Sequence, residues 1–105
     1  KGEYDRAIAD CNKALEINPR YAEAYNNRGN ACSNKGEYDR AILDYNKALE
    51  INPQYAEAYY NRAVACYYKK EYDKAWEDVH KAQGLGLQVL PGFLDVLLKA
   101  SGRQR

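Results

Sequence analysis

Apolar and small residues recur at steps of three and four along most of the chain, a pattern that predicts amphipathic helices. In one stretch they fall at positions 38, 41, 42, 45, 48 and 49, so we expect a helix over residues 38–51. Asn52-Pro53 ends this helix, because a residue before proline is disfavoured in the helical conformation. Residues 22–34 predict a preceding helix, in which Gly29 lets Ala41 of the following helix approach closely. The basic unit is therefore a pair of helices.

This helix pair repeats along the chain. Residues 1–8 and 35–42 both read KGEYDRAI, and residues 1–34 differ from residues 35–68 at only eight positions. A weaker third copy begins at Lys69. Since one helix pair cannot bury its apolar faces alone, a 34-residue period predicts a stack of such pairs. We expect one all-α domain over residues 1–105, divided into a half repeat (1–21), two repeats (22–55 and 56–89) and a C-terminal helix with its tail (90–105).

The units resemble the tetratricopeptide repeat (TPR) family over roughly residues 1–86. The family's pattern of aromatic, leucine-glycine, tyrosine, alanine, phenylalanine and proline positions falls in the middle unit on Tyr25, Arg28-Gly29, Cys32, Ala41, Tyr45 and Pro53. The resemblance implies a right-handed TPR helical-repeat solenoid of about two and a half repeats, closed by a capping helix. It also implies a non-catalytic protein–protein interaction scaffold that binds a peptide or a partner helix in its concave groove.

Half of the repeat mismatches lie on one stripe of the first helix of each unit, the helix that lines the groove in the resembled family. Asparagine amides suit a peptide backbone, and tyrosine rings add broad contact area. We therefore predict a peptide-binding groove formed by Asn26, Asn27, Asn30, Tyr60, Asn61, Val64, Tyr67 and Tyr68. The alternative is that these are merely solvated helix positions.

Some family members hold a C-terminal carboxylate with lysine, asparagine and arginine on these helices. Here the points that match lysine and arginine carry Glu57 and Asn61, although Asn27 fits the asparagine. The sequence therefore does not favour a carboxylate clamp.

Composition narrows the partner. A net charge of +1, a pI of about 7.8 and a mean hydropathy of -0.82 argue against nucleic acid or a membrane surface. The single histidine, His80, has no nucleophile at a useful spacing, so we predict neither an enzyme nor a bound metal or cofactor. The partner we expect is a protein or peptide.

The three cysteines lack metal-ligand spacing and are too few for a disulfide framework. We expect reduced, buried thiols in a cytoplasmic protein, with a Cys11–Cys32 bridge or a small pocket beside a thiol as alternatives. Near-identical units and the absence of methionine favour an engineered or consensus-like chain, for which Lys1 is not a natural start.

The segment GFLDVLLKAS, residues 92–101, is apolar nearly all round when placed on a helix. We expect a helix over residues 91–101, in which Leu94, Leu97 and Leu98 cover the last repeat. The remaining apolar surface predicts a homo-oligomer, with a dimer favoured, through Phe93, Val96, Leu97 and Ala100. An engineered self-assembling scaffold is the alternative function.

Overall fold

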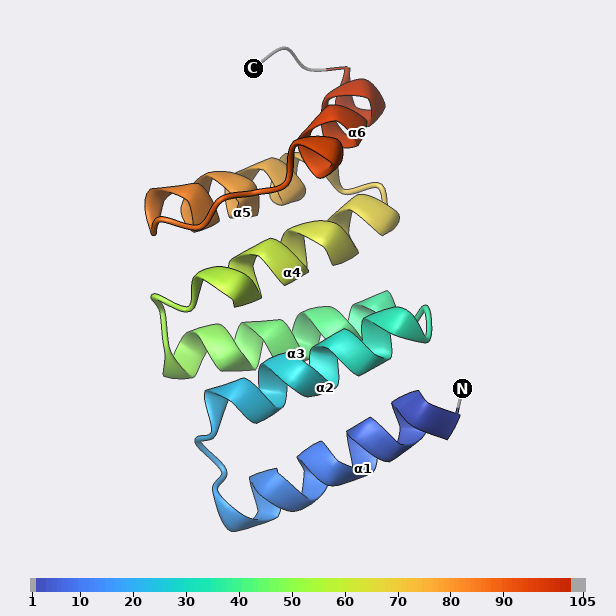
Figure 1. Cartoon of the computed structure of the whole chain (residues 1–105), viewed down its shortest axis with the longest axis vertical. Coiled ribbons are helices and arrows are strands. Elements are labelled where there is room, and N and C mark those ends of the chain that lie inside the picture. Colours follow the sequence, from blue (N-terminus) through green and yellow to red (C-terminus); the bar gives the residue numbers. More distant parts are fainter. Residues whose placement is uncertain (1, 103–105) are drawn as a thin grey trace.

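The computed structural model describes residues 2–102 and contains six α-helices over that range (Figure 1). No strand occurs among these residues, and none of their helices is long and apolar enough to span a membrane. The all-α prediction is thus confirmed. The helices are α1 (Gly2–Ile17), α2 (Ala22–Asn34), α3 (Tyr38–Ile51), α4 (Ala56–Tyr68), α5 (Tyr72–Gly84) and α6 (Pro91–Ser101).

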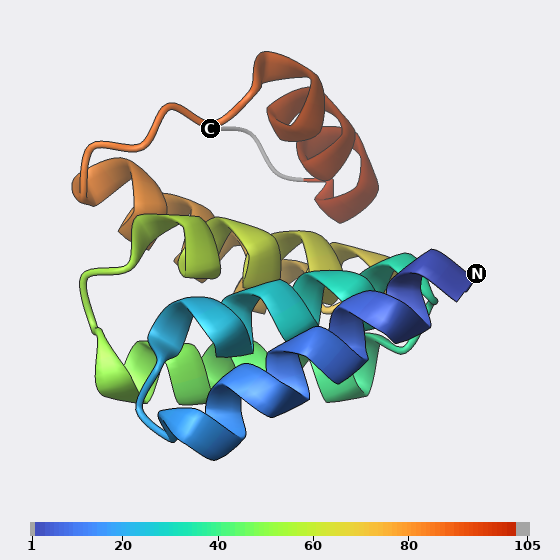
Figure 2. The same ribbon diagram turned by 60° about the horizontal axis from the view of Figure 1, so that its bottom comes forward.

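Consecutive helices from α1 to α5 lie side by side and alternate in direction, whereas α6 rises steeply from the end of the stack (Figures 1 and 2). The second helix α3 packs between the first helices α2 and α4, α5 packs between α4 and α6, and α2 also touches α4. Alanine occupies the closest approaches, because Ala41, Ala48, Ala58 and Ala75 are completely buried. This arrangement is the stacked helical-repeat solenoid that the 34-residue period predicts.

A single arginine joins three helices in the first complete unit. Arg28 of α2 donates from Nε and Nη2 to the two carboxylate oxygens of Asp44 on α3, at 3.0 and 2.8 Å. Its Nη1 donates to Asn12 Oδ1 on α1 at 2.8 Å. The guanidinium also lies 5.4 Å from the ring centroid of Tyr25. We call this arrangement the arginine clamp.

The arginine clamp recurs 34 residues later. Arg62 of α4 donates to both carboxylate oxygens of Asp78 on α5 at 2.8 Å, and to Asn46 Oδ1 on α3 at 2.7 Å. The Tyr59 ring centroid lies 5.6 Å from its guanidinium. Both aspartates are buried, and a bidentate pair demands a fixed geometry. Each clamp therefore sets the position of one first helix against two second helices.

Gly29 is required by the aromatic residue opposite it. A Cβ atom at Gly29 would lie 2.6 Å from Cε1 of Tyr45, which is far too close. In the next unit the equivalent positions are Ala63 and Val79, both fully buried. Where the first helix carries alanine instead of glycine, the second helix carries valine instead of tyrosine. Packing therefore explains the mismatch between Gly29 and Ala63.

All three cysteines are free thiols, so the alternative of a Cys11–Cys32 disulfide is not realised. Cys32 and Cys66 are buried as expected, whereas Cys11 is only half-buried. Desolvation raises the pKa of the Cys66 thiol to about 11. Such a thiol is a weak nucleophile at neutral pH.

The first prediction concerns the arginine clamp. Arg62→Ala leaves the Asp78 carboxylate, only 6% exposed, without its countercharge. We expect a loss of about 3 kcal/mol in the free energy of unfolding, near the lower end for a buried pair because Arg62 keeps 25% exposure. Urea unfolding followed by circular dichroism measures this loss.

The matched control is Arg40→Ala, since the Arg40 side chain is 68% exposed and pairs only with Glu37. We expect a change below about 0.5 kcal/mol for this control. Equal losses for the two variants would contradict the role of the clamp.

The second prediction concerns the fit of Gly29 to Tyr45. Gly29→Ala raises helix propensity by about 1 kcal/mol, yet the clash with the ring costs about 1–3 kcal/mol. We expect a net destabilisation in the native chain and none in a Tyr45→Val background. A double-mutant cycle from unfolding curves measures the coupling, and additive effects would refute the fit.

Candidate functional site

The first helices of the two complete units, α2 and α4, contact each other, and each has one face with exposed side chains. On each helix the residues of one stripe, at spacings of four, three and four, share one helical face, and both ends of the stripe are exposed. We call this surface the α2–α4 face; it consists of Glu23, Asn27, Asn30 and Asn34 from α2 and Glu57, Asn61, Val64 and Tyr68 from α4.

Two predicted groove residues are exposed on this face. Asn27 is exposed, and its amide can both donate and accept hydrogen bonds. Tyr68 is 56% exposed and stacks on Tyr38, with the ring centroids 5.2 Å apart and the planes inclined by 12°. The stacking fixes the orientation of the Tyr68 ring while more than half of the side chain stays exposed.

Asn26, by contrast, does not lie on the exposed stripe. It is 5% exposed, and its Oδ1 accepts a hydrogen bond of 3.1 Å from Nδ2 of Asn61. These two predicted groove residues therefore bind each other between α2 and α4. Asn61 stays half-buried, and only Asn61 remains partly accessible to a ligand.

Tyr60 and Tyr67 contact the C-terminal helix. The Phe93 ring of α6 meets both tyrosine rings edge-on, at centroid distances of 5.6 and 5.8 Å. We expected Phe93 to lie uncovered, and it is instead half-buried against the core. Tyrosines replace Asn26 and Ser33 at these equivalent positions because the neighbouring helix differs: α2 faces α4, whereas α4 faces α6.

Asn30 also has a structural partner. Its Oδ1 accepts a hydrogen bond of 2.7 Å from the Tyr45 hydroxyl, and burial raises the pKa of that phenol. In the next unit Val64 takes the place of Asn30, and Val79 takes the place of Tyr45. Asn30 is present where a tyrosine hydroxyl needs an acceptor, and Val64 is present where the second helix carries valine and has no hydroxyl.

The predicted oligomer surface on α6 is smaller than expected. Leu97 is completely buried in the core of the chain, where Trp76 and Val79 lie, and so offers nothing to a second copy. Trp76 Nε1 donates to Ser101 Oγ at 3.1 Å and holds the end of the helix. Val96, at 42% exposure, and Ala100 remain at the surface.

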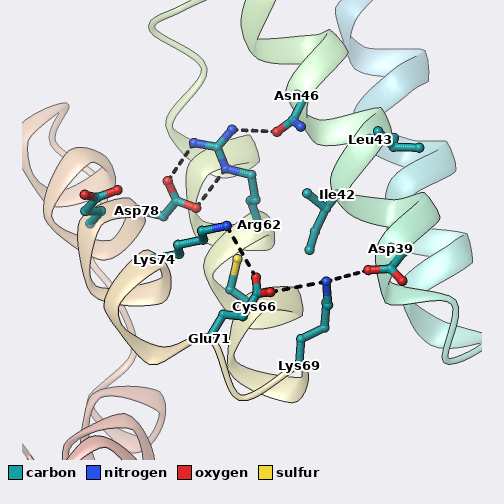
Figure 3. A pocket seen from close by; sticks show the side chains of 11 residues that line it. Asp39, Ile42, Leu43, Asn46, Arg62, Cys66, Lys69, Glu71, Lys74 and Asp78 are labelled. Carbon is teal, nitrogen blue, oxygen red and sulfur yellow. Dashed lines mark hydrogen bonds and ion pairs between the residues drawn. The ribbon is translucent and has the colours of Figure 1, made fainter.

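A cavity of about 480 Å³ opens on the other side of α4, between α3 and α5 (Figure 3). The α4 residues that reach it, Arg62 and Cys66, lie on the helix face opposite to the α2–α4 face. Lys69 bridges Asp39 and Glu71 across its mouth, at 2.5 and 3.4 Å. Most of the charged groups of the cavity are thus already paired, Lys69 with Asp39 and Glu71, and Arg62 with Asp78. The cavity therefore lies at the packing interface between repeats, and the α2–α4 face is the better candidate for a binding site.

Three family profiles match the chain. The profile described as "Tetratricopeptide repeat" matches residues 22–55, a second of that description matches 44–77, and one described as "TPR repeat" matches 1–36. The chain belongs to the tetratricopeptide repeat family, as its repeat pattern predicts. No curated protein matches it.

Solved structures of similar fold include peptide complexes. The first TPR of Spaghetti (RPAP3), bound to the HSP90 peptide SRMEEVD, superposes with a TM-score of 0.86 at 26% identity, over 96% of this chain and 79% of the other. The TPR2B domain of yeast Sti1 in its complex with pHsp70 gives 0.83 at 29% identity, over 100% and 87%. MamA gives 0.75 at 32% identity, and the match covers 79% of this chain but 48% of MamA.

Proposed function

We propose that this protein is a non-catalytic interaction scaffold that binds an extended peptide or a partner helix across the α2–α4 face. The observation that carries the proposal is the set of exposed polar and aromatic side chains on one face of α2 and α4, namely Asn27, Asn34 and Tyr68. The similarity to the TPR domain solved with the peptide SRMEEVD supports it. Asn27 supplies hydrogen bonds to a peptide backbone, and Tyr68 supplies stiff contact area.

The charges on the α2–α4 face are negative and disfavour an acidic partner. The only cations on α2 and α4 are Arg28 and Arg62, and both are held by the arginine clamps. Glu23 and Glu57 are both exposed. Burial raises the pKa of Tyr55, and the negative charges of these two glutamates raise it further. We therefore propose a neutral or basic peptide, in contrast to the acidic SRMEEVD bound by the similar domain.

The third prediction tests this face. Heptapeptides are selected from a random displayed library on the immobilised chain, and the enriched peptides are titrated by fluorescence anisotropy. We expect few acidic residues in them and, for Asn27→Arg, a loss of affinity of roughly tenfold or more, because a bulky charge then crosses the face.

Leu43→Arg is the matched control, since it adds the same side chain at a site that is 67% exposed and lines the cavity on the other side. We expect its affinity to stay within about twofold of the native value. The proposal fails if Leu43→Arg abolishes binding while Asn27→Arg does not, or if the library yields no peptide at all.

We propose self-association through α6 as a second candidate function. It is favoured by the apolar residues that remain exposed at this end of the stack, Leu90 at 66% and Val96 at 42%. Isologous contact of these residues with their own copies would give a two-fold dimer.

The fourth prediction is that sedimentation velocity detects a dimer at high micromolar concentration. Val96→Glu should yield a monomer with unchanged helical content, because it places a charge in the contact. Leu43→Glu, at the exposed apolar residue of α3, should leave the dimer intact. A native chain that is monomeric under these conditions would exclude self-association.

A further inference from the structure

The two turns that follow α2 and α4 are built alike. After α2, Lys35 binds Asp5 of the preceding second helix, with Nζ 2.6 Å from Oδ1. After α4, Lys69 binds Asp39 in the same way at 2.5 Å. Because the two ion pairs are 34 residues apart in both partners, they define equivalent positions in successive repeats.

Beside the second of these ion pairs an aromatic ring fills the available space. Tyr68 stacks on Tyr38 with a centroid distance of 5.2 Å and an angle of 12°. The rings of Tyr67 and Tyr68 form a T-shaped contact, with their centroids 5.1 Å apart and their planes inclined by 73°. The chain itself therefore shows which group fits this position, namely a planar ring stacked on the tyrosine that precedes the aspartate.

Beside the first ion pair the equivalent ring is absent. Asn34 stands where Tyr68 stands in the next unit, and Ser33 stands where Tyr67 does. A cavity of about 410 Å³ is found there, lined by Tyr4, Asp5, Asn34 and Lys35. Tyr4 is half-buried, and no aromatic ring among residues 2–102 stacks on it.

We infer that this cavity is a binding site for the planar aromatic side chain of a partner, which stacks on Tyr4 as Tyr68 stacks on Tyr38. The volume is within the range of small-molecule pockets, and offset stacking of two rings adds to the area that they bury. An aliphatic side chain would leave the Tyr4 ring without a parallel plane to stack on. The site therefore selects tyrosine, phenylalanine or tryptophan.

The site is continuous with the α2–α4 face. Asn34 is the last residue of the exposed stripe that begins at Glu23 and passes through Asn27. A peptide lying on that face thus reaches the cavity with one side chain, so this part of the inference rests on the proposed function. It specifies the partner further, as a peptide with an aromatic residue where it passes the end of α2.

The experiment starts with the ring alone. N-acetyltyrosinamide is titrated into the isotopically labelled chain, and N-acetylalaninamide serves as the control ligand. We expect saturable NMR shifts at Asp5, Asn34 and Lys35 with the tyrosine compound, and an affinity at least about tenfold weaker for the alanine compound. Equal or unsaturable shifts with both compounds would overturn the inference.

Two variants exchange the environments of the two turns. Asn34→Tyr supplies the missing ring, so it should abolish the titration at Asp5 and Lys35 and raise the melting temperature. Tyr68→Asn removes the ring from the second turn, so it should create a new site reported by Asp39 and Lys69. If Asn34→Tyr leaves the titration unchanged, the ring does not bind beside Tyr4 and the inference is wrong.

Library peptides separate this inference from the proposed function. If the tyrosine compound binds at Asp5 and Lys35 but no peptide binds the α2–α4 face, the aromatic site stands and the proposed function fails. If peptides bind and their affinity is indifferent both to Asn34→Tyr and to alanine in place of their aromatic residues, the proposed function stands and the aromatic site fails.

Discussion

The guanidinium of Arg62 lies where three helices meet, and most of the stack follows from how it is held. Its paired hydrogen bonds to Asp78 fix α4 against α5, and its bond to Asn46 fixes the same helix against α3. A buried ion pair adds little net stability, because desolvation offsets much of the attraction between the charges. What the pair contributes is register, since a planar fork and a carboxylate match in few arrangements. The completely buried alanines then allow the helices to approach at that register.

Once register is fixed, the differences between the repeats become local adjustments to unlike neighbours. Asn26 contacts Asn61 because α4 is the helix beside it, whereas Tyr60 and Tyr67 contact Phe93 because α6 is the helix beside them. A mismatch between repeats therefore indicates either a changed packing partner or a free surface. The burial of each side chain decides between the two, and by that criterion the mismatched pair Asn34 and Tyr68 belongs to the exposed surface.

Periodicity predicted the helices over residues 22–34, 38–51 and 91–101 with the bounds that the structure has, since the spacing of apolar positions and the Asn-Pro stop are local signals. It could not predict the rotation of α6, because a helix that is apolar nearly all round has no polar face to fix its orientation. Leu97 is buried against the last repeat, as expected, but Phe93, which was expected to lie uncovered, also packs against the core. The arginine clamps also escaped the sequence analysis, although a signal was present. Arginine stands at the family's leucine position in both units, and a buried arginine requires a carboxylate.

The clamps also shape the surface on the other side of α4. The clamps hold the only cations of α2 and α4 against the second helices, Arg28 on Asp44 and Arg62 on Asp78. Glu23 and Glu57 are therefore the only charges on the α2–α4 face. The interactions that fix the stack thus determine the sign of the surface available to a partner. On the proposed function, this surface discriminates largely by rejection, since an acidic ligand would meet two carboxylates and no cation of α2 or α4 outside the clamps. Attraction then depends on amide hydrogen bonds and aromatic contacts, which are short-ranged and specific in geometry.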